Sequence, residues 1–87
     1  MNKRVELEKR ENQGALLLFV DGVRAGEIEF LFEKPNRMVI SHTGVFREFE
    51  GLGLGRYLVD EAVKYAQQEQ LVLSAICPFA AKVLSGK

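Results

Sequence analysis

The stretch EGLGLGR, residues 50–56, places a glycine at every second position near the middle of an 87-residue chain. Glycine lets the backbone adopt positive φ angles and come close to a ligand. The residues before this stretch have the pattern of β-strands, and a helical pattern follows it. The first N–H groups of a helix have no partner inside the helix and favour phosphate. The stretch therefore predicts a strand-to-helix loop that suits an anionic ligand.

The spacing of these glycines excludes three well-known loops. A dinucleotide fingerprint needs G-x-G-x-x-G, a nucleotide-triphosphate loop needs G-x-x-x-x-G-K followed by Ser or Thr, and a KH module needs G-x-x-G. None of these spacings occurs in residues 50–56. The same glycines can also form a tight turn that only packs a helix on a strand, and the two interpretations stay open at this point.

The residues before the loop predict strands. Charged and apolar residues alternate around Val5 and Leu7, which is typical of a half-buried edge strand, until residues 12–14 break the pattern. Residues 15–20 are apolar on both faces and predict a central strand. Asp21-Gly22 then predicts a tight hairpin turn, because both positions of such a turn need positive φ angles.

A third strand follows the hairpin turn. Ile28, Phe30 and Phe32 share one face of it, while Glu27 and Glu29 share the other, polar face. This alternation predicts a strand that is buried on one side only.

Residues 34–37 predict the next turn, because they contain a proline and an asparagine. A fourth strand is expected from Met38 to about Phe46. Its alternation places Ile40, His42 and Phe46 on one side and residues 39, 41, 43 and 45 on the other, with a bulge at Gly44.

Helical periodicity begins after the glycines. Apolar residues at spacings of three and four predict a helix from Arg56 to about Gln70. Residues 71–76 predict a buried strand that pairs in parallel with the fourth strand through a right-handed crossover. Pro78 is expected to open a last short helix over residues 79–84, with Gly86 just past its end. The fold class is therefore α/β in the mixed α+β sense: mostly antiparallel N-terminal strands, then strand, loop, helix, strand and helix.

Length and composition limit the functions further. The chain predicts one domain, residues 1–87, with a thin core that makes a monomer or a weak homodimer the expected state. Twelve basic and twelve acidic residues leave no net charge, which argues against nucleic-acid and anionic-membrane partners. No apolar run is long enough to span a bilayer, no secretion signal is visible, and one cysteine forms no internal disulfide, so a cytoplasmic location is expected. One cysteine and one histidine without zinc-type spacing predict no metal site.

Two side chains stand out as candidates for chemistry. If Pro78 is the first helical residue, Cys77 is the N-cap, where the helix dipole favours the thiolate and makes the thiol a candidate nucleophile or acid. Histidine changes charge near neutral pH, so His42 suits a general base for an ammonium substrate. The alternative for both is structural: a small buried thiol, and a histidine satisfied within the core.

The pattern resembles the GNAT superfamily of acyl-CoA-dependent N-acetyltransferases. Their signature is Gln or Arg, two residues, Gly, one residue, then Gly or Ala, and Gly53 and Gly55 fill the two small positions. Glu50 stands where the superfamily usually has Gln or Arg. The pairs His42-Thr43 and Cys77-Pro78, followed by Phe79, resemble the short, minimal YjdJ-like members, which commonly continue beyond the last helix with a His-Pro-x-aromatic segment that this sequence lacks.

The resemblance implies a cofactor site. Pantetheine is expected along the fourth strand where that strand splays from the fifth, with acetyl-CoA as acyl donor and the loop amides facing its pyrophosphate. The two arginines of the set offer paired donors to phosphate. The expected cofactor-binding residues are Val45, Phe46, Arg47, Gly51, Leu52, Gly53, Leu54, Gly55 and Arg56. Cys77 and His42 are the expected catalytic residues.

The function implied by the resemblance is N-acetyl transfer from acetyl-CoA to a primary amine of a small molecule or a protein. One alternative is a coenzyme A-binding or protein-interaction module of the same fold with weak or no catalysis, because so short a chain supplies few walls for an acceptor pocket. Another is a structural domain that binds no coenzyme A. Turnover with an amine distinguishes the first from the second, and cofactor binding distinguishes both from the third.

Overall fold

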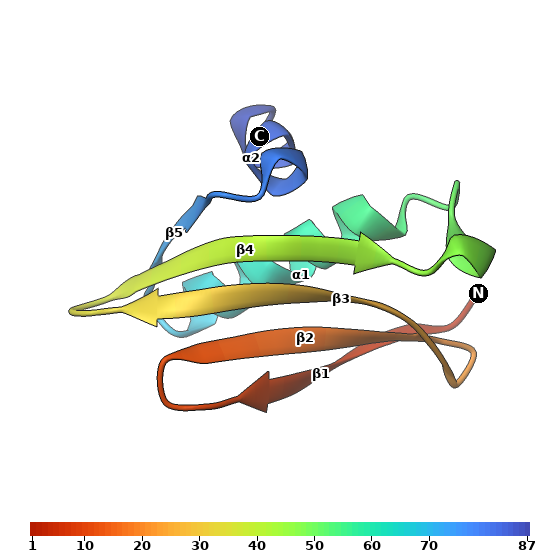
Figure 1. The fold of residues 1–87 in the computed structure, drawn as a ribbon, viewed down its shortest axis with the longest axis horizontal. Helices are drawn as coiled ribbons and strands as arrows, with labels where there is room; N and C mark the ends of the chain where they lie inside the picture. Colours follow the sequence, from red (N-terminus) through yellow and green to blue (C-terminus); the bar gives the residue numbers. More distant parts are fainter.

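The alternating first half of the chain forms four antiparallel strands, and the second half adds a helix, a short parallel strand and a second helix (Figure 1). The computed structural model describes residues 1–87. The elements are β1 (Lys3–Lys9), β2 (Gln13–Val20), β3 (Val23–Glu33), β4 (Arg37–Val45), the 3-10 helix η1 (Arg47–Phe49), α1 (Leu54–Gln68), β5 (Val72–Ala75) and α2 (Pro78–Ser85). The strands lie in the order β1-β2-β3-β4-β5, and only β4 and β5 are parallel. The predicted fold class is confirmed.

The predicted hairpin between β2 and β3 is confirmed. Asp21 and Gly22 both have positive φ angles, 50° and 83°, which match the right-handed twist of the flanking strands. β2 begins at Gln13, two residues before the predicted start. Gly14 lies inside the strand, and a side chain there would come within 3 Å of the Phe30 ring and the Glu8 carbonyl oxygen, which explains the glycine.

The core lies on one face of the sheet. Ile28, Phe30 and Ile40 from the strands are at most 1% exposed and face α1, whose Leu58 and Val59 are fully buried. Apolar spacings of three and four give α1 this buried face. Figure 1 shows α1 lying behind the sheet and α2 beyond β5, so the other face of the sheet carries no helix.

β5 differs from its prediction in burial. It is an edge strand, and Val72 and the following Ile76 are both at least half exposed, whereas a buried strand was expected. The strand has only four residues and pairs with β4 on one side. The continuous apolar run in the sequence therefore belongs to an edge strand that leads into α2, and not to a buried strand. No helix in the structure combines the length and the apolar character that a membrane crossing requires.

Candidate functional site

β4 and β5 separate after a short parallel ladder. Residues 37–40 of β4 pair with residues 72–75 of β5, and the Ile40 carbonyl then accepts hydrogen bonds from the N–H groups of Ile76 and Cys77, at 2.9 and 3.2 Å. After that point the chain turns into α2, while β4 continues to Val45 beside β3 alone. The two strands thus diverge, and beyond Ile40 the β5 side of β4 has no neighbouring strand; we call this break in the sheet the opening.

A β-bulge at Ser41 decides which β4 side chains face which side of the sheet. Ile40 pairs with Phe30 and His42 pairs with Glu29, so Ser41 is the extra residue. Its hydroxyl donates a hydrogen bond to the Glu29 carbonyl at 3.3 Å. The predicted bulge at Gly44 is therefore wrong.

The bulge also corrects the predicted sides of β4. Thr43 pairs with the buried Ile28 and lies on the core side, as does Ile40. His42 lies on the opposite face, which has no helix and which we call the outer face. An extra residue reverses the alternation of a strand, and for this reason Ile40 and His42 do not share a face.

The backbone of β4 presents polar groups to the opening. The Phe46 N–H donates to the Ala25 carbonyl at 2.8 Å, and antiparallel ladders alternate bonded and non-bonded residues. The N–H and C=O groups of Thr43 and Val45 therefore point away from β3, toward the opening. The Phe46 carbonyl accepts from Phe49, so both backbone groups of Phe46 are already used. Its ring is 40% exposed.

Cys77 lies where the opening begins and is the N-cap of α2, as predicted, with Pro78 in the first turn. It is 8% exposed, and its Sγ lies 3.6 Å from Thr43 Oγ1. Burial raises the pKa of the thiol, but hydrogen bonds from the Ala80 N–H, the Thr43 hydroxyl and the N–H groups of Phe79 and Thr43 lower it more. The pKa of Cys77 therefore lies below its ordinary value of 9.0, and the site favours a thiolate.

His42 is bound by a carboxylate on the outer face. Its Nε2 lies 3.1 Å from Glu27 Oε2, and Glu27 Oε1 accepts from Arg24 Nη2 at 3.0 Å. A side chain on Gly44 would come within 3 Å of both Glu27 Oε2 and His42 Nε2. The glycine that was expected to form the bulge instead leaves room for this pair. His42 and Cys77 lie on opposite faces of β4, and no hydrogen bond joins them.

The loop before α1 contains glycines with two different roles. Gly51 and Gly53 have φ angles of 80° and 74°, and no atom lies within 4 Å of a side chain built on either. Gly55 is helical, and a side chain there would meet the Phe79 ring at 2.9 Å. The first two glycines therefore leave an open surface over the start of α1, and the third one lets α2 pack against it.

The start of α1 has free donors. Gly53 is the N-cap, and its carbonyl accepts from the Tyr57 N–H at 3.1 Å, so the amides of residues 54–56 precede the first helical hydrogen bond. The Leu54 side chain is buried, and only its backbone is available to a ligand. Arg47 and Arg56 are exposed and form no ion pair. Two guanidinium groups thus remain free near an open helix N-terminus.

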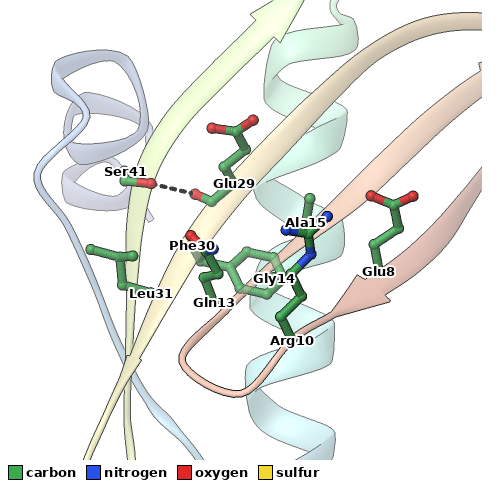
Figure 2. Close-up of a pocket in the computed structure, with 9 residues that line it drawn as sticks. All are labelled: Glu8, Arg10, Gln13, Gly14, Ala15, Glu29, Phe30, Leu31 and Ser41. Atoms are coloured by element: carbon green, nitrogen blue, oxygen red, sulfur yellow. Dashed lines mark hydrogen bonds between the residues drawn. The ribbon is translucent and has the colours of Figure 1, made fainter.

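A shallow polar groove of about 240 Å³ crosses the outer face (Figure 2). Glu29, the ladder partner of His42, and the bulged Ser41 both line it. The lining residues are Glu8, Arg10, Gln13, Gly14, Ala15, Glu29, Phe30, Leu31 and Ser41. No group of three or more His, Cys, Asp or Glu side chains is close enough to hold a metal ion.

Two parts of this arrangement were not identified from the sequence. These are the contact of Glu27 with His42 and the contact of Arg24 with Glu27. The alternation at Glu27 and Glu29 shows that both face outward, but it does not show which of them reaches His42. That depends on the register across the bulge, which the sequence pattern alone does not reveal.

Comparisons with known proteins agree on one family. A model of the GCN5-related N-acetyl-transferases matches residues 16–87. A GCN5-like protein from Staphylococcus aureus is a proposed N-acetyltransferase. Its solution structure matches this chain with a TM-score of 0.65. It is 31% identical, and the match covers 93% of this chain and 78% of that protein. A comparison with curated protein sequences gave no match.

Two further solved structures share the fold. The ribosomal-protein-alanine N-acetyltransferase from Brucella melitensis biovar Abortus 2308 matches with a TM-score of 0.70 and 20% identity over 86% of this chain. A proposed streptothricin acetyltransferase from Bacillus anthracis, in complex with acetyl coenzyme A, matches with a TM-score of 0.60 and 21% identity over 71% of this chain. This chain spans 62% of the first protein and 35% of the second.

Proposed function

The chain belongs to the GCN5-related N-acetyltransferase family, and from this premise we propose that it transfers an acetyl group from acetyl-CoA to a primary amine of a small molecule or a protein. The observation that carries the proposal is the opening between β4 and β5. It has backbone groups of β4 on one side and, where it begins, a thiol whose pKa is lowered. Acetyl-CoA, when bound, supplies the acetyl group as an activated thioester.

The residues of this chain fit such a cofactor. The backbone groups of Val45 and the Thr43 carbonyl would hydrogen-bond the pantetheine chain, because they face the opening, whereas the Thr43 N–H already donates to Cys77. The exposed Phe46 ring and the exposed Leu52 would flank it. This arrangement supports the expectation for Val45, and for Phe46 we propose a contact through its side chain.

The glycine loop would hold the phosphates. Gly51 and Gly53 leave open space above the first amides of α1, where a helix N-terminus favours negative charge. Arg47 and Arg56 would add paired donors, because neither is used in an ion pair of the protein. Gly55 contributes its backbone N–H, and the absence of its side chain serves the packing against Phe79.

The two proposed catalytic groups would work from opposite faces of β4. His42 on the outer face would accept the proton of the amine, and the groove beside it would receive the rest of the acceptor. Cys77 on the core side would give its proton to the departing sulfur, or take up the acetyl group first. Separate faces keep the acceptor and the cofactor from competing for the same space.

Cofactor binding is tested by thermal unfolding with excess acetyl-CoA. Ligand at about 100 times Kd stabilises the folded state by about 2.7 kcal/mol, which for a domain of this size raises Tm by roughly 10–20 °C. Arg56→Gln is expected to weaken binding, whereas Lys64→Gln, which removes the same charge from α1 two turns further on, is expected to leave it unchanged. An equal effect of the two substitutions would remove Arg56 from the site.

Catalysis is tested with radiolabelled acetyl-CoA and a panel of primary amines, including a lysine-containing peptide. Cys77→Ala and His42→Ala are each expected to lower kcat without abolishing acetyl-CoA binding. Label on Cys77 in the absence of an amine supports acetyl transfer through the thiol. Binding without turnover across the panel and without label on Cys77 would instead indicate a coenzyme A-binding module.

A further inference from the structure

On the outer face, three side chains form a continuous chain of polar contacts that ends at the imidazole. Arg24 Nη2 lies 3.0 Å from Glu27 Oε1, and Glu27 Oε2 lies 3.1 Å from His42 Nε2. Each carboxylate oxygen of Glu27 therefore contacts a different partner. The Glu27 side chain is only 17% exposed, while the His42 side chain is 52% exposed. The arrangement thus has a covered carboxylate at its centre and an accessible imidazole at its end.

The surrounding backbone fixes this chain of contacts. Arg24 Nε donates to the Gly26 carbonyl at 3.1 Å, and the guanidinium lies 5.6 Å from the centre of the Phe46 ring. Gly44 lies beneath Glu27 and His42, and a side chain there would collide with both. Because Gly44 does not have a positive φ angle, this close approach is the reason for a glycine at this position.

We propose that Glu27 is a positioning residue for His42, holding the proton of the neutral imidazole on Nε2 so that Nδ1 is free to take a proton from the acceptor. The inference rests on the proposed function, because acetyl transfer is the reaction in which His42 would take up the proton. A carboxylate accepts hydrogen bonds only, so a ring nitrogen facing it must carry the proton. This use of a carboxylate to set a histidine tautomer is the same as in histidine bases that are oriented by an aspartate.

The proton transfer balances without any further group. An N–H bond of the acceptor ammonium breaks, its electron pair stays on the amine nitrogen, and the proton forms a bond to Nδ1. The resulting imidazolium lies next to the negative charge of Glu27, and the exposed ring can pass the proton to water. The charged groups that face His42 are Glu27 and Glu29 from β3, with Arg24 behind Glu27, and β5 contributes no titratable side chain.

The test uses the fact that the chain has a single histidine. In 15N-labelled protein at a pH where the imidazole is neutral, the shifts of Nδ1 and Nε2 report the tautomer. The couplings to the ring protons tell the two nitrogens apart, and a single histidine needs no residue assignment. We expect the Nε2–H form alone in the wild-type protein and a mixture of both forms in Glu27→Ala. Glu33→Ala is the matched control, because Glu33 lies on the outer face of the same strand and pairs with an arginine, Arg37, far from the opening.

A second variant guards against loss of folding. Glu27→Gln keeps the size of the side chain, and its amide can donate or accept, so it should also produce a mixture of tautomers. In acetyl transfer to a lysine-containing peptide we expect it to lower kcat about ten-fold with unchanged KM for acetyl-CoA, and to have no further effect in a His42→Ala background.

The outcomes separate this inference from the proposed function. Ring nitrogen shifts that are the same in wild-type protein, Glu27→Ala and Glu27→Gln would overturn the role of Glu27, whatever the activity. The shift measurement needs neither acetyl-CoA nor an acceptor. A shift change without any acetyl transfer by the wild-type protein would therefore support the Glu27–His42 arrangement and count against the proposed reaction.

Discussion

Thr43 and Cys77 meet across the opening of the sheet, 34 positions apart in the chain. The Thr43 hydroxyl and N–H both stabilise the Cys77 thiolate, together with the N–H groups of Ala80 and Phe79. Dipoles that are fixed by a strand and a helix lower a pKa without a charged partner. The reactivity of this thiol is thus a property of how β4 and α2 are placed.

Thr43→Val tests the contribution of the hydroxyl. The substitution keeps the shape of the side chain but removes Oγ1, so the pKa of Cys77 should rise toward its ordinary value. We expect the midpoint of iodoacetamide alkylation against pH to move upward. Thr43→Ser restores the hydroxyl and should return the midpoint close to that of the wild-type protein. An unchanged midpoint in Thr43→Val would show that the backbone donors alone set the thiol pKa.

The same thiol predicts a pH dependence of stability. Its pKa in the folded protein lies below the ordinary value, so the folded state favours the thiolate. The resulting stabilisation is complete above the unfolded-state pKa and disappears as the pH falls through the folded-state pKa. Urea unfolding should therefore show that the wild-type protein gains free energy of unfolding relative to Cys77→Ala between pH 7 and pH 10. A constant difference over this range would contradict the lowered pKa.

At the scale of elements, the loop between η1 and α1 distinguishes glycines that look equivalent in the sequence. Gly51 and Gly53 are required by their positive φ angles, while Gly55 is required only by the nearness of Phe79. Phe79 is 46% exposed and is free to move away.

The three glycines should accordingly respond differently to alanine. Gly51→Ala and Gly53→Ala should each lower the free energy of unfolding by about 1 kcal/mol, because a left-handed backbone disfavours a side chain by about 1–2 kcal/mol. Gly55→Ala should change it by less, because the better helix propensity of alanine, about 1 kcal/mol, offsets the displacement of Phe79. Urea unfolding of the three variants measures the difference. Equal losses at Gly53 and Gly55 would contradict the separate roles.

The elements themselves were predictable because each has a strong local signal. Asp21-Gly22 sets the β2–β3 hairpin, the spacing of Leu58, Val59 and Ala62 sets α1, and Pro78 sets the start of α2. The bulge at Ser41 has no comparable signal. A serine is compatible with either face, and its position emerges only when β3 and β4 align their apolar residues across the strand pair.

In the predicted site too, the features with a local signal were predictable and those that depend on strand register were not. Cys77 as N-cap and the open glycine loop follow from neighbouring residues in the chain. The contact between Glu27 and His42 spans 15 positions and depends on the bulge, so the residue types alone did not reveal it.

At the scale of the whole molecule, α1 covers one face of the sheet, and charged residues protect the edge formed by β1. Three cations of β1 lie over aromatic rings: Lys3 over Tyr57 at 4.5 Å, Arg4 over Phe19 at 4.4 Å and Lys9 over Phe32 at 5.1 Å. Each such contact contributes about 0.5–1 kcal/mol when exposed. Charged side chains on an edge strand also discourage pairing with another chain.

The one-sided core predicts unequal costs on the two faces of β3. Phe30→Ala should lower the free energy of unfolding by about 3–5 kcal/mol, because the ring is 1% exposed and lies against the rings of Phe32 and Tyr65. Leu31→Ala should lower it by less than about 1 kcal/mol, because this neighbour faces outward and is 38% exposed. Denaturant midpoints compare the two variants. Similar losses would mean that the outer face is covered in solution.

Because the hydrogen-bond ladder along β4 is interrupted, neighbouring amides should also differ in their rates of hydrogen–deuterium exchange. The Phe46 amide is held by Ala25 across the sheet, whereas the amide of Val45 faces the opening. Adjacent residues of one strand should thus label at very different rates, since exchange requires the amide to be released from its acceptor. A molecule that enters the opening and accepts from Val45 would slow that one amide and leave Phe46 as it was. Deuterium uptake at a single peptide group then becomes a direct measure of occupancy.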